Sequence, residues 1–338
     1  MRSGFPEDPT DVLRGVLALT ESGTDPVSGE TLLTGTTPEQ ARGRVFGGQV
    51  MAQSLVAGTS TVAPGRQVHS MHGYFIRPGD ALKPITFAVE ELRDGRSFSV
   101  RRVHARQEGK TLMSLICSFQ EPADGLEHQS PMPTGVPDPE SLPRTSERLG
   151  HLGHPVAQEW SWARPFDIRH VDPPLETAAD KRPVATNMVW MKTFSGLDGD
   201  ENVQRAALAY ASDYTLLEPV LRRHGLAWVR PGMSIASLDH AMWWHRPARV
   251  DEWLLYVQSS PSAQGARGLS NGRIYSRTGE LVASVAQEGM LRVPRDFQNK
   301  VRGAVQDLYL KTARRPNRWS EGLDPDCSGI SACTTSSA

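Results

Sequence analysis

One β-strand is predicted for residues 235–247, Ile235-Ala236-Ser237-Leu238-Asp239-His240-Ala241-Met242-Trp243-Trp244-His245-Arg246-Pro247. Its β-branched and aromatic side chains favour a strand, and the proline ends it. Apolar side chains are expected on both faces, with Ile235, Ala241 and Trp243 on one and Leu238, Met242 and Trp244 on the other. Within such a covered strand, Ser237, Asp239 and His240 each need a polar partner, because burying an unpartnered polar group costs free energy.

The composition excludes several classes of partner. The chain has 338 residues, enough for two domains with a core each. Its 37 basic and 38 acidic residues give a formal net charge of -1 without a block of like charge, so neither a nucleic acid nor an anionic membrane is expected as a partner. Nothing near Met1 resembles a signal peptide, and no apolar run reaches about 18 residues. We therefore expect no membrane span and a cytoplasmic location.

The sequence contains an internal duplication in which a predicted helix precedes predicted antiparallel strands. In the first half these are a helix over 46–57 and strands over 68–78, 85–92, 97–106 and 111–120. In the second half they are a helix over 203–222 and strands over 235–247, 253–259, 267–276 and 281–291. Ahead of both, residues 11–19 are predicted as a helix and 21–35 as turns. The repeat predicts an α+β fold of two units, each with a sheet that wraps its helix.

Proline-rich sequence separates the two halves. Eleven of the 25 prolines lie between Glu121 and Val184, and a strand is predicted over 166–170. We therefore divide the chain into an N-terminal repeat (1–125), a Pro-rich linker (126–163), a C-terminal repeat with the candidate catalytic residues (164–295) and a C-terminal extension (296–338). The extension is polar and rich in Ser and Gly, so it is expected to be partly disordered.

Several common catalytic signatures are absent from the sequence, which has no P-loop, dinucleotide fingerprint, His-Glu-x-x-His or Cys-x-x-Cys motif. One polar residue instead stands where an apolar one is expected. Asp213 shares a predicted helix face with Ala206, Ala209, Tyr210, Leu216, Leu217 and Val220. A buried lone carboxylate is costly unless hydrogen bonds or charges hold it. Asp213 is therefore either a functional carboxylate or a structural one that fastens a neighbouring loop.

The duplication provides a test of these two alternatives. Three matches align the halves: Arg77-Pro78 with Arg246-Pro247, Glu108-Gly109 with Thr278-Gly279, and Gln120-Glu121 with Gln287-Glu288. With the helix segments 46–51 and 211–216 aligned as well, the second half has Asp213, Ser237 and Gln287 where the first half has Gly48, Val68 and Gln120. A polar set present in one half only predicts a single active centre per chain.

Asp213, Ser237 and Gln287 suit the hydrolysis of an already activated ester. A carboxylate can take a proton from water while a hydroxyl and an amide hold that water in line. Ser237 as a nucleophile is less favoured, because it is expected in mid-strand without an oxyanion turn beside it.

Other polar residues leave an alternative open. His69 or His72 could serve a hydratase or dehydratase, although packed or loop-bonded histidines fit at least as well. Asp239 and His240 are not expected to share a site, because neighbours in a strand point to opposite faces. Four further residues are expected in the core, namely Trp243, Trp244, Trp253 and Cys117.

Several longer segments resemble a known family, the TesB-like acyl-CoA thioesterase II. They are Arg44-Val45-Phe46-Gly47-Gly48-Gln49-Val50-Met51-Ala52-Gln53, His69-Ser70-Met71-His72-Gly73-Tyr74-Phe75-Ile76-Arg77-Pro78-Gly79-Asp80, Arg93-Asp94-Gly95-Arg96-Ser97-Phe98, Ser118-Phe119-Gln120, Tyr210-Ala211-Ser212-Asp213, Leu238-Asp239-His240-Ala241-Met242-Trp243 and Gln287-Glu288-Gly289. The similarity covers roughly residues 10 to 293, with the motifs in the family's order.

The resemblance implies a double hotdog fold, in which two sheets each wrap a long helix and are fused in one chain. It also implies hydrolysis of fatty acyl-CoA to free fatty acid and CoA without a metal or other cofactor. The family's catalytic Asp, Ser or Thr, and Gln fall on Asp213, Ser237 and Gln287 of this sequence. Peroxisomal members end in a Ser-Lys-Leu type signal, which the ending Ser336-Ser337-Ala338 lacks.

If the substrate is an acyl-CoA, further features of the site and of the assembly are expected. Free backbone N–H groups at a helix start near Gly47 and Gly48 are expected to polarise the thioester carbonyl. The acyl chain is expected in an apolar slot between the halves, and exposed sheet edges favour a homo-oligomer, either a dimer or a tetramer. Two alternatives are a hotdog hydratase, which would depend on His69 or His72, and a non-catalytic acyl-CoA-binding protein.

Overall fold

The computed structural model describes residues 4–294, so the extension predicted over 296–338 lies outside the described residues. Residues up to Arg292 group into one compact unit. Its helices are α1 (Thr10–Leu17), α2 (Gly47–Thr59), α3 (Thr145–Leu149), α4 (Pro155–Trp162), α5 (Glu201–Ser212), α6 (Glu218–Arg223) and the 3-10 helix η1 (Pro139–Ser141). Its strands are β1 (Thr20–Thr24), β2 (Thr31–Gly35), β3 (Gln67–Phe75), β4 (Ile85–Asp94), β5 (Phe98–Gln107), β6 (Lys110–Gln120), β7 (Phe166–His170), β8 (Thr186–Thr193), β9 (Ser234–Ser237), β10 (Asp239–Trp244), β11 (Leu254–Gln264), β12 (Arg267–Ser276) and β13 (Leu281–Arg292).

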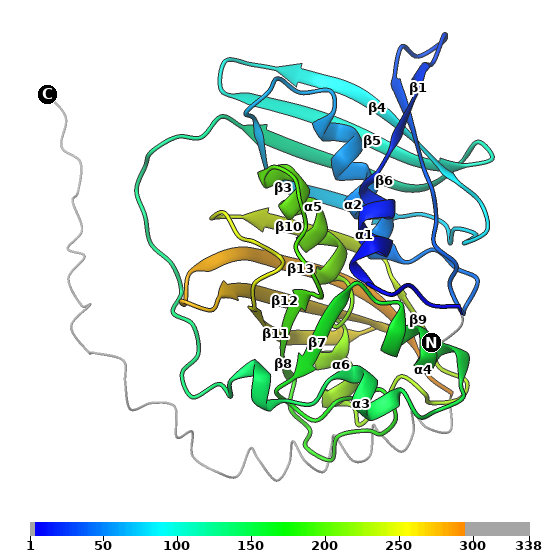
Figure 1. The fold of residues 1–338 in the computed structure, drawn as a ribbon, viewed down its shortest axis with the longest axis vertical. Helices are drawn as coiled ribbons and strands as arrows, with labels where there is room; N and C mark the ends of the chain where they lie inside the picture. The colour runs from blue at the N-terminus through cyan, green and yellow to red at the C-terminus, as the bar shows by residue number, and fades with distance from the viewer. Residues whose placement is uncertain (1–3, 295–338) are drawn as a thin grey trace, which may run out of the picture. The chain divides into compact units, whose positions relative to one another are not determined.

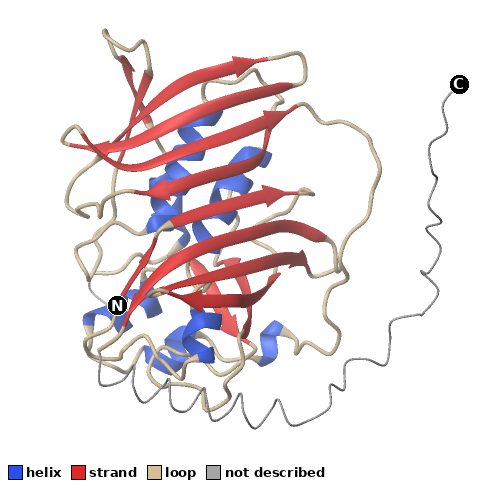
Figure 2. Cartoon of the chain, turned by 180° about the vertical axis from the view of Figure 1, so that it is seen from behind, coloured by secondary structure: helices blue, strands red, loops and turns tan. Residues whose placement is uncertain are grey.

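The strands form one antiparallel sheet that runs through both halves of this unit (Figure 1). Its order is β1-β2-β4-β5-β6-β3-β10-β13-β12-β11-β8-β7, and β9 pairs with β13 beside this path. The order of the second half is therefore the mirror of the first. Helices α2 and α5 lie together against one face of the sheet, behind the strands in Figure 2. This is the predicted α+β double hotdog fold.

Strands β3 and β10 join the halves. His72 of β3 lies opposite Ala241 of β10. Each is five positions before the Arg-Pro of its own half, at Arg77 and Arg246. The approximate two-fold relation between the halves therefore passes between His72 and Ala241.

The helix predicted over 203–222 is broken in the structure, which corrects that prediction. Helix α5 ends at Ser212, turns follow, and α6 begins only at Glu218. Pro219 gives the physical reason, because it has no backbone N–H for a helical hydrogen bond and is tolerated only in a first turn, where it stands in α6. The break leaves Asp213 just beyond the end of α5 rather than in the middle of a helix.

The strand predicted over 235–247 is interrupted by a β-bulge. Ser237 lies opposite Gly289 and Ala241 opposite Ala286, so four steps along β9 and β10 match three steps along β13. One extra residue reverses the facing of the side chains beyond it.

The bulge corrects the predicted faces of this strand. Ile235 and Ser237 turn toward the same inner face as His240, Met242 and Trp244. Trp243 is 37% exposed and is not a core residue, whereas Trp244, Trp253 and Cys117 are buried as predicted.

Three parts of the chain contain more secondary structure than predicted. Residues 21–35, predicted as turns, contain most of the β1–β2 hairpin, and strand β8 was not predicted. The predicted linker contains η1, α3 and α4, and it packs against the second half, where Tyr275 Oη donates to Pro131 O and Trp190 Nε1 to Pro137 O. The division at 125/126 and 163/164 stays a prediction. None of the helices in residues 4–294 is long and apolar enough to cross a membrane.

Candidate active site

Asp213 receives hydrogen bonds on both oxygens of its carboxylate. The hydroxyl of Ser237, at the end of β9, donates to Oδ1 at 3.2 Å. The backbone N–H of Gly48, in the first turn of α2, donates to Oδ2 at 3.0 Å. The carboxylate of the second half is therefore held partly by the backbone of the first half.

Gln287 completes the predicted set. It lies on β13, is 1% exposed, and its Nε2 donates to Ser237 Oγ at 2.7 Å. Ser237 faces Gly289, so Gln287 is its diagonal neighbour on the same face of the β9–β13 pair. The structure thus brings Asp213, Ser237 and Gln287 together, although their roles in a reaction stay predictions.

Gly47 and Gly48 allow the helix start to approach Asp213 this closely. A Cβ added at Gly47 would lie 2.6 Å from Asp213 Oδ2, and one at Gly48 would lie 2.3 Å from Tyr210 O. Side chains at either position would push α2 and Asp213 apart. The N–H of Gly48 is engaged by Asp213, while the predicted role of Gly47 and Gly48 in binding substrate remains untested.

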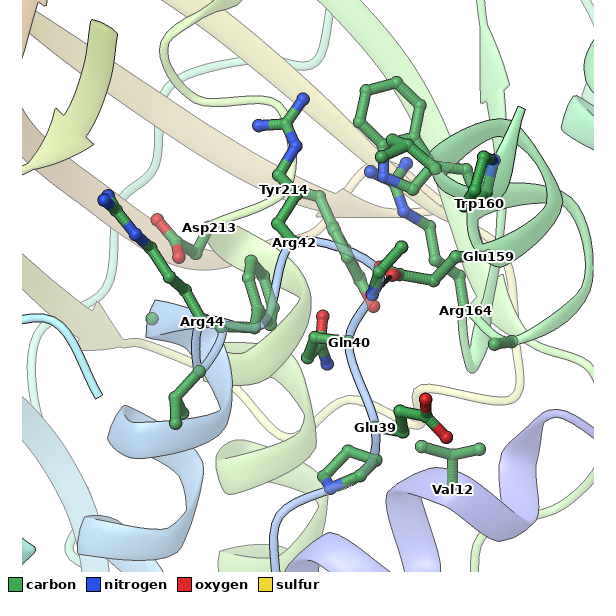
Figure 3. A pocket seen from close by; sticks show the side chains of 18 of the residues that line it. Val12, Glu39, Gln40, Arg42, Arg44, Glu159, Trp160, Arg164, Asp213 and Tyr214 are labelled. Carbon is green, nitrogen blue, oxygen red and sulfur yellow. Dashed lines mark hydrogen bonds between the residues drawn. The ribbon is translucent and has the colours of Figure 1, made fainter. Parts of the chain in front are cut away.

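A cavity of about 1050 Å³ opens beside Asp213 (Figure 3). Its wall includes Asp213, Ser237 and Gly47, together with the aromatic rings of Phe46 and Tyr214, which stack with centroids 4.7 Å apart. A cavity of this size falls at the upper end of the range for small-molecule sites.

Helix α4 of the predicted linker supplies another part of the cavity wall. The Arg164 guanidinium lies 4.2 Å from the ring centroid of Trp160 and 4.7 Å from that of Tyr214. Arg42 and Arg44 line the same cavity (Figure 3). Sequence reasoning missed this wall, because the linker carries no helix or motif signal that relates it to the site.

Burial sets the protonation of the candidate carboxylate. It raises the pKa of Asp213 to about 6, against the opposing effect of the polar groups of Gln287, Ser237 and Gly48. A carboxylate with this pKa is mostly charged at neutral pH and is a stronger base than an ordinary one.

The alternative histidines lie away from the cavity. His69 Nε2 lies 2.8 Å from Ser118 Oγ of the neighbouring strand, and burial lowers its pKa. His72 is exposed and packs edge-on against Trp243. Neither histidine lines the cavity beside Asp213.

Strand registers correct one predicted correspondence between the halves. His72 lies opposite Ile116 in the first half, as its counterpart Ala241 lies opposite Ala286 in the second. One residue further along each strand, Gln287 therefore corresponds to Cys117, not to Gln120. The prediction relied on the Gln-Glu dipeptide found in both halves, and this match aligned β6 with β13 in the wrong register.

His240 contacts Gln287, which the sequence did not predict. The bulge turns its side chain to the inner face, where its Nδ1 lies 2.5 Å from Gln287 Oε1. The neighbouring Asp239 accepts a hydrogen bond from the Glu288 backbone N–H.

Comparisons with known proteins agree with the class that the fold and site define, a double hotdog thioester hydrolase. Family models described as acyl-CoA thioesterase and acyl-CoA thioesterase N-terminal domain match residues 168–290 and 35–120. Acyl-CoA thioesterase 2 of Haemophilus influenzae is 38% identical over 255 residues, which cover 74% of this chain and 88% of that protein. Human acyl-coenzyme A thioesterase 8 is 38% identical over 303 residues, 85% of this chain and 92% of that protein.

A solved structure gives the same result. The crystal structure of an acyl-CoA thioesterase II from Mycobacterium marinum is 39% identical, with a TM-score of 0.67, and the match covers 84% of this chain and 99% of that one. The chain belongs to the acyl-CoA thioesterase family.

Proposed function

We infer that this protein hydrolyses fatty acyl-CoA to free fatty acid and CoA, with Asp213 as the general base. The observation that carries the proposal is the Asp213 carboxylate at the cavity wall, held by the Ser237 hydroxyl at 3.2 Å and the Gly48 N–H at 3.0 Å. Its raised pKa of about 6 keeps it charged at neutral pH while making it a better proton acceptor.

In the proposed reaction, a water molecule held near Ser237 and Gln287 gives a proton to Asp213 and attacks the thioester carbonyl carbon. The negative charge on the carbonyl oxygen is stabilised by a backbone N–H of the first turn of α2, for which Gly47 is the candidate. The C–S bond then breaks, and the CoA sulfur receives the proton from Asp213. The proposal assigns no step to a metal or other cofactor.

The cavity wall supports an acyl-CoA substrate. Arg42, Arg44 and Arg164 supply positive charge that suits the phosphates of CoA. Phe46 and Leu217 supply apolar surface beside Asp213, as an acyl chain requires.

Release of free thiol from acyl-CoAs of graded chain length tests the proposal. Wild type should release CoA, and Asp213→Ala should reduce kcat/KM by about 10²-fold or more, because general-base catalysis contributes about 10²- to 10⁴-fold. Undiminished release by Asp213→Ala would overturn the role of Asp213.

The alternative functions give different results in the same assay. A hydratase would require His69 or His72, so His69→Ala and His72→Ala are the matched variants. If the protein is a thioesterase that depends on Asp213, both variants should retain thiol release. A non-catalytic acyl-CoA-binding protein would release no thiol in either the wild-type or the Asp213→Ala form.

We also propose a cytoplasmic, homo-oligomeric protein, either a dimer or a tetramer. Strand β1 is exposed along its whole length at one edge of the sheet. Trp243 of β10 and Ile116 of β6 expose apolar surface on the outer face of the sheet. Sedimentation equilibrium tests the assembly, and a monomer at micromolar concentration would contradict it. Fluorescence microscopy of the tagged full chain tests the location.

A further inference from the structure

We propose that His240 is a positioning residue that fixes the direction in which the Gln287 amide donates its hydrogen bond to Ser237. The inference rests on the proposed function, because it concerns how the three candidate residues are held. It adds His240, together with Ser212 behind it, to a site so far described by Asp213, Ser237 and Gln287.

His240 is in direct contact with Gln287 and cut off from solvent. Its side chain is 1% exposed, with Nδ1 2.5 Å from Gln287 Oε1 and Nε2 3.0 Å from Ser212 Oγ. Ser212 is the last residue of α5 and is itself fully buried. The imidazole therefore links the helix that ends just before Asp213 with the strand that carries Gln287.

The charged Asp213 carboxylate sets the direction of donation, because it only accepts and Ser237 therefore donates to it. The carbonyl oxygen of an amide only accepts, so His240 Nδ1 must carry the hydrogen. Burial lowers the pKa of His240 to about 4, so the ring is neutral near pH 7 and its Nε2 accepts. Ser212 Oγ is then the donor to Nε2, in preference to Ala209 O at 2.8 Å.

These bonds form a chain with a single direction. Ser212 donates to His240, His240 to Gln287, Gln287 to Ser237, and Ser237 to Asp213 Oδ1. A reversed Gln287 amide would present Oε1 to Ser237 and compete with Asp213 for the single hydroxyl hydrogen. His240 Nδ1 could accept from the reversed amide only as the other tautomer, with its Nε2–H donating to Ser212. The reversed amide is therefore disfavoured at Ser237 and Asp213, and His240 supports the forward amide by donating to Oε1.

The duplication supports this role independently. Strand register makes Met71 the first-half counterpart of His240, as Val68 is that of Ser237 and Cys117 that of Gln287. All three counterparts are apolar or weakly polar and at most 1% exposed. The half that holds Asp213 is polar at each of these places, and His240 is one of them.

The test compares His240→Leu with His240→Asn. Leucine removes the donor to Gln287, whereas the Asn Nδ2 can take the place of His Nδ1. We expect His240→Leu to lower kcat about tenfold with little change in KM, and to move the acid limb of the pH profile of kcat/KM to higher pH. His240→Asn should restore most of kcat and the position of the limb.

The control is His245→Asn. This exposed histidine also bonds a β13 hydroxyl, with Nε2 2.9 Å from Ser284 Oγ, and should leave both kcat and the pH profile unchanged. Other ionisable groups around Asp213 are untouched in all variants, namely Glu39, Arg42, Arg44, Glu159, Arg164, Tyr210, Tyr214 and Tyr256.

Ser212→Ala provides a second variant should His240→Leu fail to fold. It leaves the imidazole in place but removes its donor, and should move the acid limb in the same direction by a smaller amount. The inference would be overturned if the acid limb of Ser212→Ala stayed in the wild-type position while that variant kept full activity. It would also be overturned if His240→Asn failed to restore the activity lost in His240→Leu. Asp213→Ala distinguishes the two proposals, because its retained activity would overturn the general base itself.

Discussion

The two halves share one fold but differ where they face the cavity. At corresponding positions the first half has Val68 and Cys117, and the second has Ser237 and Gln287. The predicted match of Gly48 with Asp213 is wrong, because Gly48 lies at the start of α2 whereas Asp213 follows the end of α5. Val68 and Cys117 are buried in an apolar core, whereas Ser237 and Gln287 bond to each other. The duplication thus kept the framework twice and the candidate chemistry once.

The first half nevertheless contributes to the site through its backbone. Gly48 N–H holds Asp213 Oδ2, and the bare Cα of Gly47 leaves room for that oxygen. The halves are therefore complementary: one supplies the acid–base group and the other supplies space and N–H groups at a helix start. The predictions below test this division of roles between the halves.

The largest effect is expected from Gly47→Ala. The new Cβ would lie 2.6 Å from Asp213 Oδ2, so the carboxylate must move, and a displacement of about 1 Å can cost about 10²-fold in rate. Thiol-release kinetics should show a loss of at least that order with a folded protein.

Gly15→Ala is the control for this glycine. A Cβ there meets nothing within 4 Å, so activity should be unchanged and α1 slightly more stable. Equal kcat/KM for Gly47→Ala and wild type would mean that the first half does not constrain Asp213.

A smaller loss is expected from Gln287→Ala, compared with Gln120→Ala in the first half. Gln287 donates to Ser237 Oγ, and loss of one such bond corresponds to about tenfold in kcat. Gln120 ends β6 and is the counterpart predicted from sequence alone, so its variant should stay within about twofold. If Gln120→Ala lost as much activity as Gln287→Ala, the site would not be confined to the second half.

The pH dependence of the wild type should report the candidate base of the second half. Because the pKa of Asp213 is raised to about 6 and the charged form is the active one, kcat/KM should fall about tenfold per pH unit below about pH 6. Stopped-flow thiol detection between pH 4.5 and 8, on the order of half a unit apart, measures this limb. A limb near pH 4 would indicate an unburied carboxylate.

A last prediction concerns the stability of the fold rather than its activity. The pKa of Asp213 is higher in the folded state than its unfolded value near 3.8, so its contribution to stability is greatest below about pH 4 and is lost as pH rises through about 6. Asp213→Asn should therefore be more stable than wild type at pH 7 by about 1 to 3 kcal/mol, with the gap closing toward pH 4. Urea unfolding at both pH values measures it, and a less stable Asn variant at pH 7 would contradict the burial argument.

Much of this could be predicted from the sequence because its signals are local. Alternating strands and Arg-Pro ends revealed the duplication, and Asp213 stood out among apolar neighbours. Comparison with Val68 then pointed to Ser237, which the structure places in contact with Asp213.

The features that the sequence did not predict depend on the register between paired strands. A single extra residue near Leu238 turns His240 toward Gln287, and no residue type marks such a bulge. The Gln-Glu dipeptides suggested Gln120 as the counterpart of Gln287, because a local match cannot reveal a shift between long-range partners. The break at Pro219 was visible in the sequence but outweighed by the helical spacing around it.

The role of Asp213 as a base, rather than as a nucleophile that forms an anhydride, is tested most directly by a single turnover in H₂¹⁸O. With enzyme in excess over acyl-CoA, direct attack by water predicts that each released fatty acid carries one ¹⁸O and that the peptide containing Asp213 carries none. Unlabelled fatty acid, with ¹⁸O in the Asp213 peptide, would contradict the account.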